Sequence, residues 1–301
     1  CRRPCGAGPR RPGVPRPPAP HGRSAMEFAK VTALLRATTL EAAVLTGRLV
    51  LYPSGIVPER LAPARPDDEP VPLGGGGGRP VVLLHGFVDN RSVFLLLRRA
   101  LARHGRHHVV SLDYPPLTGD LRTAAEALGR RIEAVLARTG RTEVDLVGHS
   151  LGGLVARYYV QCLGGDARVR TLVTLGTPHA GTSVAAPLAD AHPLVRQMRP
   201  GSEVLRELAA PAPGCRTRFV SFWSDLDRIM VPVETARLDH PDLRVHNVRV
   251  SGIGHLALPV HPTVATGILT ALDGDAVEDR GAEGAGGGMR EGTAEGSSSV
   301  A

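Results

Sequence analysis

The chain has 301 residues, of which 42% are apolar and 3% aromatic, so it is long enough for one large domain with a sizeable core. Its net charge of +7 is uneven, because residues 1–25 carry six arginines and no acid whereas residues 273–301 are acidic. Lys30 is the only lysine, and the arginines between these ends form no dense basic run interleaved with aromatic residues. A nucleic-acid partner is therefore not expected, since such partners need a concentrated basic patch.

The first 25 residues are rich in proline, glycine and arginine and cannot build a core. They begin with Cys1, so we expect either a disordered basic leader or a misassigned start, with Met26 as the alternative first residue. Residues 26–57 predict an amphipathic helix, because apolar residues recur at spacings of three and four. Charged residues interrupt this segment, so it matches neither a membrane span nor a signal peptide. Packing on the main domain and attachment to a membrane surface both stay open.

Residues 58–79 contain five consecutive glycines and predict a linker, and residues 273–301 predict a disordered tail. Between them, over residues 80–272, short apolar runs alternate with amphipathic segments. The runs predict strands at PVVLLHG, HHVVSLDY, EVDLVG, VRTLVTLG, RTRFVSFW and LRVHNVRVSG. The other segments predict helices over residues 92–104, 120–139, 151–163 and 264–272. In the first of these, Val93, Leu96, Leu97, Ala100 and Leu101 are expected to point inward. Several strands are apolar on both faces, so we predict an α/β domain with a mostly parallel sheet and helices on both faces.

One serine stands between glycines where a predicted strand meets a predicted helix, in the stretch VDLVGHSLGG at residues 144–153. A hydroxyl is a weak nucleophile unless a base takes its proton. A glycine at 148 and another at 152 let strand and helix pass closely, so that Ser150 lies at the apex of a sharp turn. We therefore predict that Ser150 is a catalytic nucleophile. The alternative is a serine that only caps the helix.

Two backbone N–H groups are expected to bind the oxyanion that forms when a serine attacks a carbonyl. One belongs to Leu151, at the start of the helix. The other belongs to Phe87, in the turn LLHGF after the first strand, for which a plain strand-to-helix turn is the alternative.

The base is expected to be a histidine that follows the acid, because enzymes with this turn place their triad in the order serine, acid, histidine. Four histidines satisfy this order: His240, His246, His255 and His261. We select His255, which follows the last predicted strand between flexible glycines in VSGIGHLALP. Of the upstream histidines, His149 and His179 border the site and are expected to shape loops rather than transfer protons.

The acid is predicted to be Asp227, in the turn SDLDRIMVP after the strand RTRFVSFW. Asp225 lies two residues upstream and is the alternative. We prefer Asp227 because the acid must reach across to the histidine loop, whereas Asp225 is better placed to bond nearby backbone N–H groups.

The cysteines Cys162 and Cys215 have no spacing typical of a metal site. They are expected either to pair as a disulfide in an oxidising compartment or to be two buried thiols. We therefore expect neither a metal nor a cofactor.

These residues give the chain a resemblance to bacterial triacylglycerol lipases and esterases of the α/β-hydrolase superfamily, over residues 79–272. The resemblance rests on LLHGF, VGHSLGGLVARYY, LVTLGTPHAGT, FWSDLDRIMVP and GIGHLALP, in family order. A dehalogenase or epoxide hydrolase would carry aspartate at position 150. The lack of convincing strands before Pro80 resembles the compact lipases, whose sheet lacks the first two strands. The resemblance implies hydrolysis of lipid-like carboxylic esters through a serine acyl-enzyme, without cofactor or metal.

Several alternatives stay open at this point. A thioesterase or acyltransferase would share the triad, and a non-catalytic lipid-binding protein could keep the fold. The segment between GTPHAGT and Cys215 is either a small lid or ordinary packing of two short helices. We expect a small lipid or ester substrate and a monomer, with contact to a lipid interface left open. An extracellular or membrane-associated setting is favoured over a cytoplasmic one.

Overall fold

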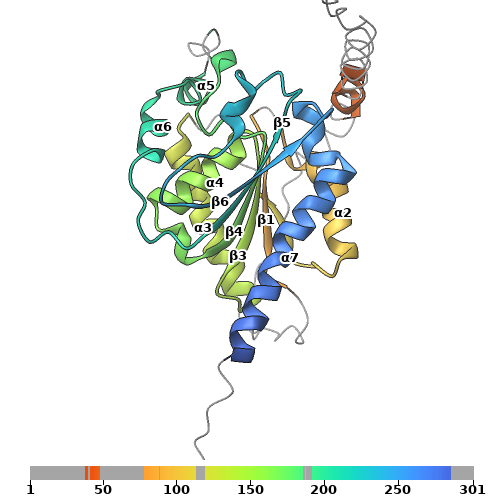
Figure 1. Ribbon diagram of the computed structural model, residues 1–301, viewed down its shortest axis with the longest axis vertical. Coiled ribbons are helices and arrows are strands. Elements are labelled where there is room, and N and C mark those ends of the chain that lie inside the picture. The colour runs from red at the N-terminus through yellow and green to blue at the C-terminus, as the bar shows by residue number, and fades with distance from the viewer. Residues whose placement is uncertain are drawn as a thin grey trace, which may run out of the picture.

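A six-stranded parallel sheet forms the centre of the molecule in the computed structural model (Figure 1). The structure describes residues 38–39, 41–47, 78–87, 89–112, 119–185, 187 and 192–285, with side chains described as far as residue 274. The strand order is β2-β1-β3-β4-β5-β6, and every neighbouring pair is parallel. The strands are β1 (Val81–Leu84), β2 (Val109–Leu112), β3 (Val144–His149), β4 (Val169–Leu175), β5 (Arg218–Ser224) and β6 (Arg244–Val250). The predicted fold class is therefore confirmed, and no residue described before β1 lies in a strand.

The central strands are apolar on both faces because both faces are covered. Every residue of β1 and β3 is buried, whereas β6, at the edge, has only one fully buried residue. Continuous apolar runs such as VVLL suit central strands of a parallel sheet, which meet helices above and below. The burial pattern of each strand thus follows from its place in the strand order.

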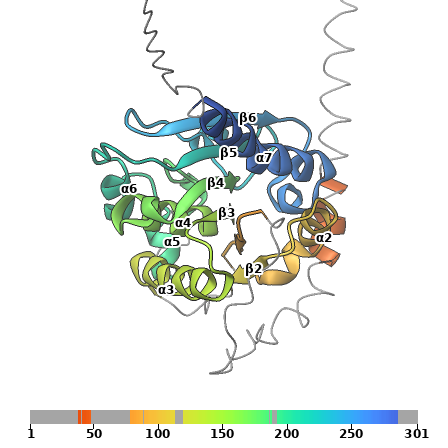
Figure 2. The same cartoon turned by 90° about the horizontal axis from the view of Figure 1, so that it is seen from below.

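Helices cover the two faces of the sheet in two separate groups (Figures 1 and 2). One face carries α3 (Leu121–Thr139), α4 (Leu151–Cys162), α5 (Pro193–Gln197) and α6 (Glu203–Leu208). The other face carries η1 (Arg91–Phe94), α2 (Leu95–Arg103), η5 (His255–Val260) and α7 (Pro262–Ala285). Each group packs its apolar residues on the sheet in a core cluster of its own. The shorter turns η2 (Gly165–Ala167), η3 (Ser183–Ala185) and η4 (Val233–Ala236) lie in the connections.

The boundaries of α3 show how local sequence sets a helix. The Asp120 side chain accepts a hydrogen bond from the Arg122 N–H at the start, and Gly140 ends the helix in the left-handed conformation at φ 64°. An acidic N-cap and a C-terminal glycine are the usual helix signals, so the predicted helix over residues 120–139 was readable from them.

Two predicted helices differ from the observed ones. The segment 92–104 begins as the 3₁₀ turn η1 before α2, and Leu96, predicted to point inward, is 51% exposed. The inward stripe of α2 consists of Leu97 and Leu101, four residues apart, which turns Leu96 to solvent. The last helix was predicted to end at Leu272 but continues to Ala285 and runs through Gly274, although a glycine costs about 1 kcal/mol relative to alanine inside a helix.

The predicted terminal segments lie mostly outside the described residues. Of the predicted helix over 26–57, residues 38–39 and 41–47 are described, and all of them are helical. The leader 1–25, nearly all of the linker 58–79 and the tail beyond 285 fall outside. Within the described residues, no helix is both long and apolar enough to cross a bilayer.

The segment that could be a lid is largely part of the core. Six of its described apolar side chains are buried in the core cluster that includes α3, α4 and the sheet, namely Leu194, Val195, Met198, Val204, Leu205 and Leu208. This burial agrees with the packing alternative.

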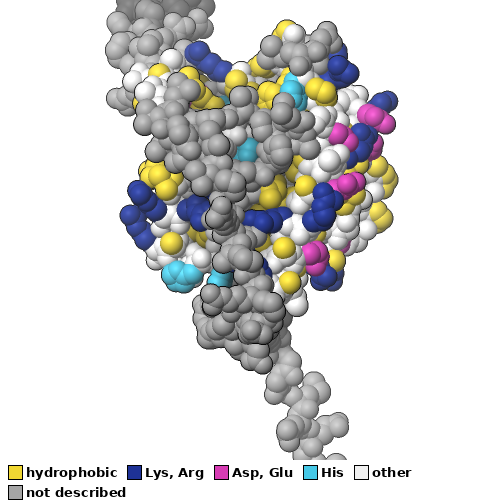
Figure 3. Space-filling view, turned by 180° about the vertical axis from the view of Figure 1, so that it is seen from behind, with side chains coloured by type: hydrophobic (Ala, Val, Ile, Leu, Met, Phe, Trp, Pro, Cys, Tyr) yellow, Lys and Arg dark blue, Asp and Glu magenta, His cyan; other side chains and the backbone are white. Residues whose placement is uncertain are grey.

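On the face shown in Figure 3, the described basic side chains are scattered and acidic ones lie among them.

The two cysteines of the domain are free, with Cys162 exposed and Cys215 half-buried. The disulfide alternative is therefore not realised, and the thiols are less buried than the other alternative supposed. Partial burial raises the pKa of both thiols.

Candidate active site

The predicted catalytic residues follow four strands of the sheet at the edge where parallel strands end. Phe87 follows β1, Ser150 follows β3, Asp227 follows β5 and His255 follows β6. The carboxyl ends of parallel strands meet at one edge, which is where α/β proteins build their sites. The fold alone therefore brings these distant parts of the sequence to the same end of the molecule.

Ser150 occupies a sharp turn between β3 and α4. Its backbone has φ 52° and ψ −121°, and it is the only non-glycine residue with positive φ in the described part of the chain. Its N–H donates to the Leu175 carbonyl at 2.9 Å, which ties the turn to β4. The Ser150 side chain makes no capping hydrogen bond to α4, which disfavours the alternative of a mere capping serine. A backbone of this kind costs about 1–3 kcal/mol and is found where function requires it.

The glycines around Ser150 are required by close backbone contacts. A Cβ atom at Gly148 would lie 2.6 Å from the backbone nitrogen of Gly153. A Cβ at Gly152 would lie 2.5 Å from the carbonyl oxygens of both Leu84 and His85. Because these neighbours are backbone atoms, they cannot rotate away, and β1, β3 and α4 can approach this closely only when both positions are glycine.

His255 and Asp227 form a buried hydrogen-bonded pair. The distance from His255 Nδ1 to Asp227 Oδ2 is 2.7 Å, and the two residues are 4% and 2% exposed. The other carboxylate oxygen of Asp227 accepts the N–H groups of Ile229 and Met230, at 2.9 and 3.0 Å. Burial alone would raise the pKa of Asp227, but the charge and hydrogen bond of His255 and the two N–H groups outweigh it and lower that pKa. Asp227 is therefore ionised when it faces the imidazole.

The alternative acid, Asp225, lies in another environment. Its carboxylate accepts hydrogen bonds from the Arg249 guanidinium at 2.9 Å and from the Gly252 N–H at 3.2 Å. It thereby holds the turn between β6 and η5, as expected of a turn-shaping aspartate, while the hydrogen bond to His255 belongs to Asp227.

The other three candidate histidines have other roles. His240 shares a hydrogen bond with the Ala210 carbonyl at 3.0 Å, and His246 is exposed on the edge strand β6. His261 follows η5 and accepts the Thr263 N–H at 3.3 Å. Of the four, His255 is the one that bonds to Asp227.

His149, which precedes the serine, supports the backbone of His255. The two rings lie 4.8 Å apart, and His149 Nε2 is 3.2 Å from the His255 carbonyl oxygen, to which it must donate. Its Nδ1 lies 3.6 Å from a carboxylate oxygen of Asp89. The sequence identified His149 as a loop-shaping residue but gave no sign of Asp89, because the contact joins the end of β3 to a turn far away in the sequence. His149 therefore links the serine turn directly to the histidine loop.

The two residues predicted as oxyanion donors, Phe87 and Leu151, lie in the two turns that meet at Ser150. A Cβ on Gly86 would be 3.3 Å from the Ser150 Cβ, so the turn that carries Phe87 lies against the serine. Leu151 is the first residue of α4, and N–H groups in the first turn of a helix have no acceptor within it. The Phe87 ring packs edge-on against His192 at 5.0 Å, which places the start of α5 beside this turn.

The N-terminal helical residues also reach the histidine loop. The Glu41 carboxylate accepts the Ala257 N–H at 3.0 Å, in the first turn of η5, the short helix that begins with His255. Nearby, Val44 packs on the core cluster of this face. The sequence indicated an amphipathic helix here but not its partner, because no local pattern links residues so far apart.

No described cluster of three or more histidine, cysteine or acidic side chains could hold a metal ion. What the arrangement provides is a hydroxyl, an imidazole, a carboxylate and a helix N-terminus. This is the set of groups that acyl transfer uses.

Comparison with known proteins agrees with this geometry. Residues 79–201 match the family model described as the alpha/beta hydrolase fold. A triacylglycerol lipase of Pseudarthrobacter phenanthrenivorans is 33% identical over 113 residues, which are 35% of this chain and 35% of that protein. The chain thus matches about a third of the length of such curated relatives.

Solved structures extend the likeness to most of the described chain. Lipase B of Aspergillus fumigatus superposes with a TM-score of 0.57 at 17% identity, covering 65% of this chain and 52% of that one. The mature lipase BlEst2 of Bacillus licheniformis gives 0.52 at 17% identity and covers 69% of this chain and 93% of that one. At such low identities these structures are evidence of the fold alone. They show the α/β-hydrolase fold of this chain, and the curated proteins that it resembles over about a third of its length are triacylglycerol lipases.

Proposed function

We propose that the protein hydrolyses carboxylic esters with lipid-like acyl groups through the triad Ser150, Asp227 and His255. The observation that carries the proposal is the buried His255–Asp227 pair at the same edge of the sheet as a serine held at positive φ. A capping or packing serine needs neither feature. The lipase relatives favour esters as the substrate class.

In the first half of the reaction, the Ser150 Oγ forms a bond to the ester carbonyl carbon while its proton passes to His255 Nε2. Asp227 accepts the Nδ1–H, fixes the tautomer and stabilises the imidazolium that forms. The N–H groups of Phe87 and Leu151 bind the oxyanion. When the tetrahedral intermediate collapses, the alcohol leaves with the proton from His255 and an acyl-Ser150 ester remains.

In the second half, a water molecule attacks the acyl-enzyme. His255 takes a proton from this water and returns it to the Ser150 oxygen as the carboxylic acid leaves. The enzyme regains its starting state, and no cofactor or metal takes part. A thioesterase would follow the same steps with a thiol as the leaving group, and an acyltransferase would replace water by another acceptor.

Labelling with a fluorophosphonate tests the proposal against a non-catalytic lipid-binding protein. We expect one phosphonyl group per chain, on Ser150 by peptide mass spectrometry. Ser150→Ala should take up no label and lose turnover by about a millionfold, as in other serine hydrolases. Ser183→Ala, a change outside the site, should label like the wild type.

Failure of the wild type to react would favour the non-catalytic alternative. Label on another residue would remove Ser150 from the mechanism. A panel of p-nitrophenyl esters from acetyl to palmitoyl, run beside matched thioesters, would then separate esterase from thioesterase and give the acyl length.

A further inference from the structure

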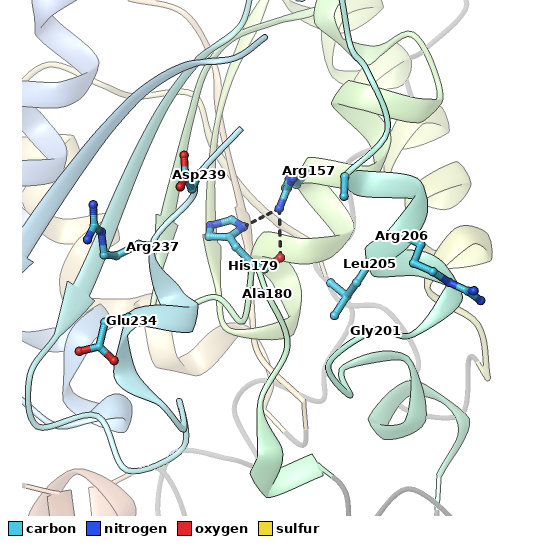
Figure 4. Close-up of a pocket in the computed structure, with 10 residues that line it drawn as sticks. Arg157, His179, Ala180, Gly201, Leu205, Arg206, Glu234, Arg237 and Asp239 are labelled. Atoms are coloured by element: carbon cyan, nitrogen blue, oxygen red, sulfur yellow. Dashed lines mark hydrogen bonds between the residues drawn. The ribbon is translucent and has the colours of Figure 1, made fainter. Parts of the chain in front are cut away.

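A cavity lies between α4, α6 and the segment that begins with η4, and none of the triad residues lines it. Its volume is about 500 Å³. Ten residues line it: Arg157, His179, Ala180, Gly201, Leu205, Arg206, Ala209, Glu234, Arg237 and Asp239. Arg157 and His179 point toward each other, with α6 on one side and residues 234–239 on the other (Figure 4).

Arg157 is a buried cation whose described partners are all neutral. It is 3% exposed, and its guanidinium donates to Gln161 Oε1 at 2.6 Å, to the Leu208 carbonyl at 2.8 Å and to the carbonyl and Nδ1 of His179 at 3.3 and 3.4 Å. A guanidinium has five N–H donors, so these contacts leave one donor on Nη2. Burial lowers the pKa of Arg157 to about 10, which still leaves it charged at neutral pH. An anion in the cavity would offset the cost of burying this charge.

His179 carries no negative charge that could balance Arg157, and its hydrogen bonds decide which of its ring nitrogens faces the guanidinium. Its Nε2 lies 3.0 Å from the Thr174 hydroxyl, which donates to Ser221, which in turn donates to the Ala236 carbonyl. The Thr174 hydroxyl donates its hydrogen to Ser221, so it can only accept a hydrogen bond from His179. The hydrogen of the neutral imidazole is therefore on Nε2, and Nδ1 faces Arg157 as an acceptor. Burial, and then the nearby charge of Arg157, hold the pKa of His179 well below its usual value. The imidazole is therefore neutral, and Arg157 is the charged group at the base.

The remaining charges select the kind of anion. Arg206 and Arg237 stand with Glu234 and Asp239 in the outer lining, and all four are exposed. Together with Arg157, the lining has three cations and two carboxylates, an excess of one positive charge. A monoanion matches this excess, whereas a dianionic phosphate would meet added repulsion from the two acids. Leu205 and the two alanines add apolar surface that suits a short hydrocarbon chain.

We propose that this cavity binds a small monocarboxylate, with the Arg157 guanidinium as the anchor and the short chain against Leu205 and Ala180. Carboxylate oxygens suit a guanidinium because both groups are planar and can share two hydrogen bonds. The proposal goes beyond ester hydrolysis and is independent of it, because it needs neither Ser150 nor His255.

Titration calorimetry of the full chain with sodium butyrate, at constant ionic strength and pH 7.5, tests the proposal. We expect saturable binding with a Kd on the order of 1 mM, typical of a small ligand held by one charged anchor. Sodium phosphate should bind at least tenfold more weakly. Arg157→Lys should weaken butyrate binding about tenfold or more, because an ammonium lacks the planar fork.

Ala209→Glu keeps the test valid where Arg157→Lys fails to fold. It adds a carboxylate to the lining at an exposed position, and it should also weaken butyrate binding about tenfold, by charge repulsion. Its matched control is Ala210→Glu, which adds the same charge at the next exposed residue, outside the lining, and should bind like the wild type. The proposal is overturned by an absence of saturable butyrate heat, by equal binding in the two glutamate variants, or by phosphate binding more tightly than butyrate.

Discussion

The serine and the histidine of the site are held in place by different kinds of contact. The serine turn is a run of consecutive residues fixed by its own backbone, with glycines against neighbouring strands and Ser150 bonded to β4. The histidine turn is fixed by side chains that come from three remote parts of the chain: Glu41, His149 and Asp227. Local backbone geometry therefore positions the nucleophile, and long-range side-chain contacts position the base.

This difference predicts different consequences of mutation. Changes in the serine turn collide with rigid backbone and should act first on folding. Changes to the side chains that bond His255 itself leave the backbone intact and should act first on turnover. Substitutions at four positions, each with a control variant, test this contrast.

The largest effect is expected at the acid. Asp227→Asn keeps an oxygen for the Ile229 and Met230 N–H groups but removes the charge that orients His255, so turnover should fall about 10⁴-fold, as in the serine protease triad. Because the pKa of Asp227 is lowered on folding, its ionised form stabilises the fold above the ordinary carboxyl pKa, and that contribution is lost as pH falls through the lowered value. The free energy of unfolding of the variant should therefore fall less on acidification than that of the wild type.

Asp225→Asn is the matched control, since it changes the same group two residues away. It should reduce turnover less than tenfold, because it weakens only the bonds to Arg249 and Gly252. Steady-state rates and melting curves of both variants decide the assignment. If the Asp225 variant is the inactive one, the acid is misassigned.

The next largest effect is expected in the serine turn. Gly152→Ala would place a Cβ 2.5 Å from two carbonyl oxygens of the β1 turn, so it should destabilise the fold by about 3 kcal/mol despite the better helix propensity of alanine. Gly47→Ala is the control, because a Cβ there meets no atom within 4 Å. Urea unfolding of both variants measures the difference. Equal stabilities would contradict a backbone-fixed serine turn.

The same contrast explains what could be predicted from the sequence. The strands and Ser150 were readable because apolar runs and the glycine spacing are local signals. His255 and Asp227 were reached by chain order and turn position, and the 2.7 Å bond between them agrees with that choice. The Asp89–His149 contact and the Glu41 contact had no local signal, since each joins parts of the chain that only the folded domain brings together. The exposure of Leu96 was missed because a 3₁₀ turn shifted the helical phase.

A smaller effect is expected at His149. His149→Leu removes the donor to the His255 carbonyl and should reduce kcat about tenfold, roughly the 1.4 kcal/mol of a lost buried hydrogen bond. His149→Gln keeps an N–H donor and should recover most of that rate. Rates that are equally low in both variants would show that the imidazole acts by its size or charge and not by this bond.

The smallest effect is expected at Glu41, the most distant support of the histidine turn. Its carboxylate accepts a hydrogen bond from the first turn of η5, as an N-cap side chain does, and removing such a cap costs about 1 kcal/mol. Glu41→Ala should therefore lower unfolding free energy by about that amount and turnover about twofold, because His255 keeps its bonds to Asp227 and His149. Glu41→Gln keeps the acceptor and should lie between Glu41→Ala and the wild type. Denaturant unfolding and kcat of the full chain measure both effects. A loss of turnover as large as that of Asp227→Asn would mean that the N-terminal helix, rather than the acid, is the principal support of the base.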